Sequence, residues 1–323
     1  MARQAMDLDG LQESLWAFAG QRVLTTAARV GLLRLLAERA CSPADAAREL
    51  GLDALATGKV LRALSAMGIV TWANDQCRIV PSLVPHLSSG DGDVSPLIAH
   101  LHHLYERWAV TLEPWLRGEE PPAPGPADPA GFGAAMSAMG RQVAKSLVAH
   151  IDLSAHRRLL EVGGGFGHYS EAFCERQPAL QATVVDREET VSLAQQRLDG
   201  TGLADRIRFV GGDYHDCAFG EGYDLALLAN ILHQELPDAA AALLARTAAS
   251  LAPGGTLAIV EFAIDDLQRE HLIGSLFAIN MRSFGDTWPE PVLRRWLAEA
   301  GLDSVERIDL SPQRWLITAR KPA

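Results

Sequence analysis

Apolar residues in the N-terminal third of the chain recur at intervals of three and four, which is the spacing of one face of an α-helix. The longest stretch with this pattern covers residues 11–37. Further helices are predicted over 42–50 and 57–67, and each is followed by a glycine. Residues 69–80 then contain two β-like runs on either side of a polar turn at Asp75 and Gln76. Helices followed by a β-hairpin in this order predict a mainly helical, winged-helix-like domain.

The pattern changes in the middle of the chain. Residues 95–116 are helical in pattern, and 118–133 form a proline-rich stretch too polar for a core. Another helix is predicted over 132–149. We therefore expect three parts, at residues 1–95, 96–150 and 151–323.

Short β-branched runs alternate with helical segments in the C-terminal half, which predicts an α/β fold with a Rossmann-like, doubly wound parallel sheet. The predicted strands are 158–162, 182–186, 207–210, 223–229 and 256–262. After a predicted helix at 289–300, two consecutive runs at 304–310 and 314–320 flank Ser311-Pro312-Gln313. A closing antiparallel hairpin of this kind distinguishes methyltransferase sheets from the all-parallel sheets of dehydrogenases.

The composition and charge of the chain argue against several classes of function. The chain of 323 residues is 48% hydrophobic and 21% charged, which is typical of a soluble two-domain protein. Its net charge of −11 argues against a nucleic-acid partner. The helix predicted over 57–67 is the candidate DNA-recognition helix of the winged-helix plan, and it offers only Lys59 and Arg62. We expect no membrane association and a cytoplasmic protein, since the sequence has neither a signal-peptide core nor a long apolar run. The four cysteines lack C-x-x-C spacing, so we expect free thiols.

A glycine-rich turn follows the first strand of the C-terminal half, in the segment LLEVGGGFGHY. Bare backbone at Gly163, Gly165 and Gly167 lets a ligand approach closely. The dinucleotide fingerprint requires a sixth-position glycine, but His168 or Ser170 stands there. The spacing therefore favours a nucleoside with an amino-acid tail over NAD, with a tight ligand-free turn as the alternative.

Two more strand ends carry acids. Asp186 ends the second strand, where a carboxylate can accept both ribose hydroxyls. The third strand runs into Gly212, Asp213 and Tyr214, so Asp213 could accept an adenine amino group while Tyr214 lies against the ring. Each acid alone could be a solvated strand end, but together they predict one ligand site at the carboxyl edge of the sheet.

These motifs resemble the plant and bacterial small-molecule O-methyltransferases, the caffeate and acetylserotonin methyltransferase type, over nearly the whole chain. The family pattern L-x-D/E-V-G-G-G-x-G is matched by the segment that ends at Gly167. The resemblance implies S-adenosylmethionine as cofactor, a dimerising N-terminal part, and a middle part that contributes to the acceptor pocket. It also implies a cofactor site at Gly163, Gly165, Asp186, Gly212, Asp213 and Tyr214. Two departures are a tyrosine at 214, where the family usually has methionine, and Ala229, where it often has a basic residue.

The segment ANILHQELPD resembles the family's L-H-D-W motif and places His233 at the general-base position. An imidazole suits this role because its ordinary pKa lies near neutrality. Gln234 and Glu235 replace the family's aspartate and tryptophan, so the surroundings of the base are altered. A histidine at a strand end can also be purely structural.

Two acids fall where the family carries acids beside the histidine. Glu261 lies in the apolar run TLAIVEFAI, and Glu290 lies in DTWPEPV. A carboxylate beside an imidazole fixes its orientation and favours its protonated form. Glu290 has an alternative explanation, because an acid in the first turn of a helix is favoured by the helix dipole.

The acceptor pocket is predicted from the resemblance, at Trp108, Met136, Met139, Phe277, Asn280 and Met281. These residues would also suit an ordinary core. Arg282 either faces an acidic acceptor or points outward. His100, His102 and His103 share one helix, but no carboxylate is placed with them in the sequence, so we predict no metal.

The sequence thus predicts a homodimeric methyltransferase that O-methylates a small, aromatic secondary-metabolite acceptor. The dimer is expected because residues 11–37 present more apolar surface than one small domain covers. C- or N-methylation, and a relative that uses bound S-adenosylmethionine for another reaction, stay open as alternatives. A ligand-responsive DNA-binding regulator is disfavoured by the acidic charge.

Overall fold

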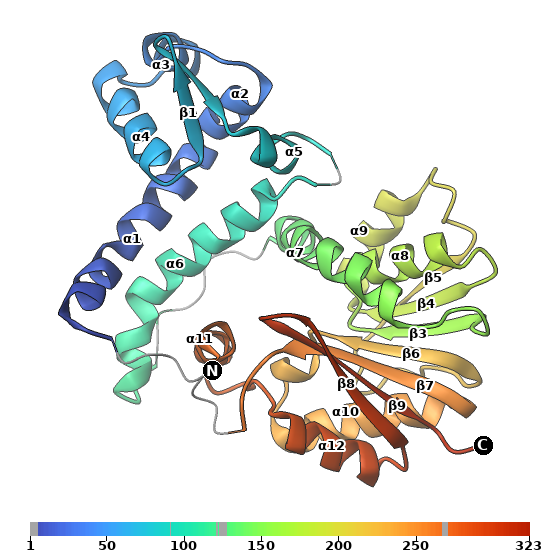
Figure 1. Cartoon of the computed structure of the whole chain (residues 1–323). Helices are drawn as coiled ribbons and strands as arrows, with labels where there is room; N and C mark the ends of the chain where they lie inside the picture. The colour runs from blue at the N-terminus through green and yellow to red at the C-terminus, as the bar shows by residue number, and fades with distance from the viewer. Residues whose placement is uncertain (1–5, 91, 121, 123–127, 267–270) are drawn as a thin grey trace. The chain divides into compact units, whose positions relative to one another are not determined.

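The computed structural model describes residues 6–90, 92–120, 122, 128–266 and 271–323 (Figure 1). The chain divides into two compact units, one ending at Met139 and the other beginning at Gly140. This boundary lies inside helix α7 (Pro129–His150). Most of the proline-rich part of the predicted connector at 118–133 lies outside the described residues, and the three-part division stays a prediction.

The first unit is mainly helical and contains one small antiparallel hairpin, β1 with β2. The stretch predicted over 11–37 is two helices, because Gly31 adopts a left-handed φ of 83° between them. The hairpin turn lies at Asn74 and Asp75, one residue earlier than predicted, and both have positive φ. The elements of this unit are α1 (Leu8–Arg29), α2 (Leu32–Glu38), α3 (Pro43–Leu50), α4 (Ala54–Ala66), β1 (Val70–Ala73), β2 (Gln76–Ile79), η1 (Pro81–Leu83), α5 (Val84–Leu87) and α6 (Ser95–Leu116).

The second unit contains a seven-stranded sheet in the order β5-β4-β3-β6-β7-β9-β8. The first five of these are parallel, and the β8–β9 hairpin joins the sheet with β9 antiparallel to β7. This arrangement confirms the predicted fold class and the closing hairpin. The strands are β3 (Arg158–Val162), β4 (Gln181–Asp186), β5 (Ile207–Gly211), β6 (Tyr223–Ala229), β7 (Leu251–Phe262), β8 (Asp303–Ser311) and β9 (Arg314–Arg320).

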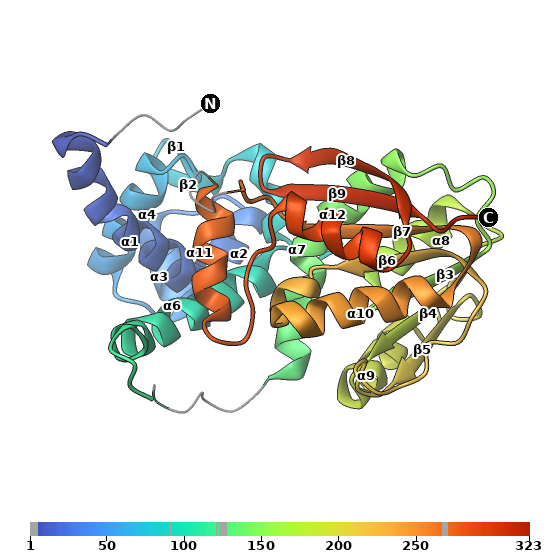
Figure 2. The ribbon, with the colours of Figure 1, turned by 90° about the horizontal axis from the view of Figure 1, so that it is seen from below.

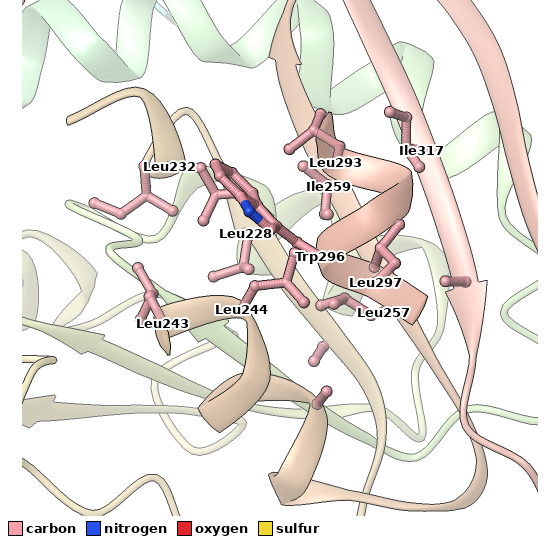
Figure 3. Close-up of a cluster of buried hydrophobic side chains, with 14 of the residues drawn as sticks. Leu228, Leu232, Leu243, Leu244, Leu257, Ile259, Leu293, Trp296, Leu297 and Ile317 are labelled. Carbon is pink, nitrogen blue, oxygen red and sulfur yellow. The ribbon is translucent and has the colours of Figure 1, made fainter. Parts of the chain in front are cut away.

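Helices cover both faces of this sheet. Successive side chains along each strand point to opposite faces, so a hydrophobic core forms on each face. One face packs against the C-terminal part of α7, α8 (His168–Arg176) and α9 (Glu188–Leu198). The other packs against α10 (Pro237–Ser250) and α12 (Glu290–Glu299), which cross it in Figure 2. Trp296 of α12 is inserted among leucines and isoleucines of α10, β6, β7 and β9 (Figure 3). The remaining elements are η2 (Leu232–Gln234) after β6 and α11 (Leu272–Met281) after β7.

Among the described residues, none of the helices combines the length and the apolar character that crossing a bilayer requires.

Candidate active site

The glycine turn begins where β3 ends, at the carboxyl edge of the sheet. Gly163, Gly165 and Gly167 have φ values of 69°, 56° and 77°, which residues that carry a side chain rarely adopt. A Cβ on Gly164 would lie 2.5 Å from Cγ1 of Val184, whereas a Cβ on Gly165 would have no heavy atom within 4 Å. The turn therefore packs closely against β4 at Gly164 and presents bare backbone to open space at Gly165.

Asp186, at the end of β4, holds this turn in place. Its Oδ2 accepts from the backbone N–H of Gly165 at 2.7 Å, and its Oδ1 accepts from that of Arg187 at 2.8 Å. Gly212 donates its N–H to the Asp186 carbonyl at 3.0 Å, which ties the end of β5 to the end of β4. The three predicted strand-end features thus meet at one edge of the sheet. The carboxylate's contact with the turn itself was not foreseen.

Two buried oxygen atoms beside the turn have no hydrogen-bond partner among the described residues: Oε1 of Glu161 and Oδ1 of Asn230. Glu161 lies on β3, and its other oxygen accepts from the backbone N–H and the hydroxyl of Ser170. Burial raises the pKa of Glu161 to about 7. Asn230 follows β6 and donates from its amide nitrogen to the Tyr169 hydroxyl at 3.2 Å.

Unpaired acceptors of this kind are suited to an ammonium group, which has three donors and no acceptor. The amino-acid end of S-adenosylmethionine carries such a group, so the residues present fit this cofactor. Sequence reasoning missed both residues. A charged residue inside the apolar strand segment LLEV was the available signal for Glu161.

Asp213 and Tyr214 lie beyond Gly212 in the loop after β5. Asp213 is exposed, and its Oδ1 accepts from the backbone N–H of His215 at 2.9 Å. Tyr214 is half-buried and donates its hydroxyl to Oε1 of Glu235. The loop therefore lies at the carboxyl edge of the sheet, where the exposed Asp213 carboxylate can face solvent or a ligand.

His233 and Glu261 form a buried pair, as predicted from the sequence. Nδ1 of His233 lies 2.7 Å from Oε2 of Glu261, and the His233 backbone N–H donates to Oε1 at 3.3 Å. Both side chains are nearly inaccessible to solvent, at 4% and 3%. The ring is also held edge-on by Phe262 and Phe277, with centroid distances of 5.6 and 4.8 Å. Since Nδ1–H donates to the carboxylate, Nε2 is the nitrogen whose lone pair is available to take a proton.

The expected role of Glu290 beside His233 stays a prediction, and its carboxylate contacts two arginines. Oε1 of Glu290 accepts from Arg294 at 2.7 Å, and Oε2 accepts from Arg307, also at 2.7 Å. Both oxygens are therefore engaged by arginines of α12 and β8. Glu290 is the first residue of α12 and connects this helix to the closing hairpin through Arg307.

The predicted acceptor residues fall in both units. Phe277 of α11 stacks on Phe262 at a centroid distance of 3.8 Å and contacts the His233 ring, so it borders the His233–Glu261 pair. Asn280 and Met281 lie on the same helix, and Arg282 ends it with a positive φ of 52°. Trp108, Met136 and Met139 belong to the first unit, and their part in a pocket stays a prediction.

The three histidines of α6 differ in burial and in contacts, although the rings of His102 and His103 lie edge to face, 5.9 Å apart. His102 is buried, and its Nε2 lies 2.7 Å from an Arg29 guanidinium nitrogen. His100 packs edge-on against Phe132, while His103 is exposed. Among the described residues, the structure places no three His, Cys, Asp or Glu side chains together as a metal site.

Comparison with known proteins identifies the family. The O-methyltransferase domain family matches residues 125–290, which is more than half of the chain. The chain belongs to this family.

Similar proteins extend the match over nearly the full length of this O-methyltransferase. A 3-hydroxy-5-methyl-1-naphthoate 3-O-methyltransferase of Streptomyces sahachiroi is 27% identical, over 93% of this chain and 90% of the relative. A tetracenomycin polyketide synthesis 8-O-methyl transferase of Streptomyces glaucescens is 28% identical, over 95% and 94%. The crystal structure of human N-acetylserotonin methyltransferase in complex with S-adenosylmethionine has the same fold, with a TM-score of 0.86 at 21% identity, covering 99% of this chain and 100% of that chain.

The predictions of family, enzyme class and cofactor are thereby confirmed. The protein is an S-adenosylmethionine-dependent O-methyltransferase with a small-molecule acceptor.

Proposed function

We propose that this O-methyltransferase methylates a hydroxyl group on a small aromatic secondary metabolite, with His233 as general base. The observation that carries the proposal is the buried His233–Glu261 pair, with Nδ1 and Oε2 2.7 Å apart. The two relatives named above act on a hydroxynaphthoate and on a tetracenomycin intermediate, which supports an aromatic acceptor.

S-adenosylmethionine, when bound, supplies a methyl group on a positively charged sulfur. Nε2 of His233 takes the proton from the acceptor hydroxyl, so that the oxygen becomes the nucleophile. Glu261 keeps the imidazole in the tautomer with the proton on Nδ1 and fixes the ring orientation. Phe262 and Phe277 pack on the ring and exclude water around it. Glu261 is thus a positioning residue, and His233 touches the acceptor.

The cofactor is held separately, by the glycine turn and the strand-end acids. We propose Gly163, Gly165, Asp186, Gly212, Asp213 and Tyr214 as its binding residues, joined by Glu161 and Asn230 at the amino-acid end. Phe277, Asn280 and Met281 would border the acceptor, together with Trp108 and Met136 of the first unit. We also propose that the enzyme is a homodimer, joined through α1.

Replacing His233 should separate cofactor binding from methyl transfer. In His233→Ala, S-adenosylhomocysteine should bind with nearly wild-type affinity in calorimetry, because the cofactor residues are untouched. Methyl transfer should fall by roughly 10²–10⁴-fold, the usual contribution of a positioned general base. Raising the pH should recover part of the rate, since an acceptor ionised by solvent no longer needs the imidazole.

Glu261→Gln is the matched comparison. Its amide oxygen can still accept from Nδ1–H, so the rate should fall less than in His233→Ala. Wild-type turnover by His233→Ala near neutral pH would refute the general-base role. If wild type bound S-adenosylhomocysteine but methylated none of a panel of hydroxylated aromatic acceptors, the proposed substrate class would be wrong.

A further inference from the structure

Two loops at the carboxyl edge of the sheet are joined by a side-chain hydrogen bond that the predicted site did not include. Tyr214, in the loop after β5, donates its hydroxyl to Oε1 of Glu235, in the loop after β6. Nε2 of His215 lies 3.2 Å from the same oxygen. The rings of Tyr214 and His215 also pack together, with centroids 4.6 Å apart. Oε1 of Glu235 thus contacts two neighbouring side chains of the loop after β5, Tyr214 and His215.

The strand order shows which strand ends lie between the two loops. In the sheet, β4 and β3 lie between β5 and β6. A bond between the loops that follow β5 and β6 therefore spans the carboxyl ends of the two strands that carry Asp186 and the glycine turn. Tyr214 packs on the core of the α10 face, so the link runs along that side.

Both ends of the link are anchored. The Arg246 guanidinium of α10 donates to the backbone carbonyls of Tyr214 and His215, and to that of Cys217 at 2.7 Å. Glu235 ends the short helix η2, and its backbone N–H donates to the Leu232 carbonyl at 3.2 Å. His233 lies on this same helix. Glu235 and His233 are therefore held in one short turn.

The electrostatic surroundings keep the Tyr214 hydroxyl as the donor of its hydrogen bond to Glu235. Burial raises the pKa of the Tyr214 phenol well above its usual range, and the bond to Glu235 adds to this, so the hydroxyl keeps its proton at neutral pH. The negative charges of Asp213 and Asp186, both predicted cofactor residues, raise the pKa of the phenol further. The Glu235 side chain is only 12% exposed, so its carboxylate depends on protein donors.

We infer that the Tyr214–Glu235 bond closes one wall of the cofactor site and couples cofactor binding to the position of the His233 turn. Glu235 is then a positioning residue for both. Tyr214 and Glu235 each depart from the family pattern, and the structure shows that the two departures satisfy each other. This inference rests on the proposed function, because it takes the carboxyl ends of β3 and β4 as the cofactor site.

A double-mutant cycle tests the coupling through S-adenosylhomocysteine affinity, measured by calorimetry on wild type, Tyr214→Phe, Glu235→Leu and the double variant. Each single change leaves one polar group short of its partner, so each should weaken binding by about 3- to 10-fold. The double variant removes both groups and should bind no more weakly than the weaker single variant, since contacting residues are not additive. Tyr223→Phe is the matched control, because its hydroxyl donates to the Phe219 carbonyl at the opposite end of β6. It should bind S-adenosylhomocysteine as wild type does.

Glu235→Gln gives a second, milder comparison, because the amide oxygen can still accept from Tyr214. It should weaken binding less than Glu235→Leu, and kcat should follow the same order. Independent, multiplying effects in the double variant would overturn the inference, as would single variants with unchanged affinity or an equal loss in Tyr223→Phe. A wild-type protein that binds no S-adenosylhomocysteine would instead refute the cofactor assignment itself.

Discussion

Glu161 lies in the middle of an apolar strand, where an ionised carboxylate is costly unless it is paired. Its side chain is fully buried, and one of its two oxygens has no partner among the described residues. Burial raises its pKa to about 7, which leaves the group partly protonated near neutral pH. A cofactor ammonium group at this oxygen would favour the charged form.

The raised pKa predicts a specific pH dependence of stability. The folded protein holds the Glu161 proton up to about pH 7, whereas the unfolded chain releases it near the ordinary value of 4.5. Stability from this group is therefore full below pH 4.5 and is lost as the pH rises toward 7. Glu161→Gln has no such titration, and its amide fits the same two contacts.

Urea unfolding of the ligand-free protein between pH 4.5 and 8 checks this. The free energy of unfolding of wild type should fall relative to that of Glu161→Gln across the window from 4.5 to 7. A difference between the two proteins that stays constant with pH would contradict the assignment.

At the residue scale, the family motif anticipated a contact that the structure shows. His233 and Glu261 were found in this way, and the structure places them together. Glu161 and Glu235 were missed because their partners come from α8 and from the β5 loop, which no local pattern reveals. The ion pair of Glu290 with Arg294 was not anticipated, although the two residues stand four positions apart, the spacing of a helical ion pair.

At the scale of elements, the parallel strands were predicted almost to the residue, because buried β-branched runs bounded by turn residues are distinctive. The fifth was the exception. Its start was expected at 256, since Pro253, Gly254 and Gly255 indicate a turn, but β7 begins at Leu251 and pairs with β6 across a register shift. In the first unit, helical periodicity continued past Gly31 and hid the break between α1 and α2.

The glycine turn allows a prediction at this scale, because two adjacent glycines have different surroundings. In Gly164→Ala the new methyl would lie 2.5 Å from Cγ1 of Val184 and 2.7 Å from Cδ of Glu161. Overpacking of this kind costs about 1–3 kcal/mol, so the variant should lose thermal stability. In Gly165→Ala the methyl meets open space, and only the positive φ of 56° adds strain, about 1–2 kcal/mol.

The two variants should also differ in how their loss of cofactor affinity compares with their loss of thermal stability. The Gly165 methyl would project where the cofactor is proposed to lie, so S-adenosylhomocysteine binding should fall further than thermal stability suggests. Scanning calorimetry and titration calorimetry on the same samples provide the comparison. Equal affinities for Gly165→Ala and wild type would exclude a close approach of the cofactor at Gly165.

On the scale of the whole molecule, α1 stands out because none of the described residues covers its N-terminal half. Leu8, Leu11, Leu15 and Phe18 follow the spacing of one helical face, and all four are exposed. The buried residues of α1 are Thr25 and Ala27, near its C-terminal end. Periodicity alone identified this apolar face in the sequence but not what covers it, because the partner surface can lie anywhere in the chain or in a second copy.

A second copy of the chain is the proposed cover, since a two-fold dimer presents the same apolar face to itself. Burying a leucine or phenylalanine stabilises by about 1.5–3 kcal/mol, so a pair of charges on this face should separate the subunits at micromolar concentration. We expect Leu15→Glu/Phe18→Glu to have the mass of one chain in light scattering, and wild type the mass of two. Leu55→Glu is the control, because Leu55 is a similarly exposed leucine on α4, at 68%, outside the α1 face. It should leave the dimer intact. A monomeric wild type, or a dimer that survives both charges on α1, would refute dimerisation through this helix.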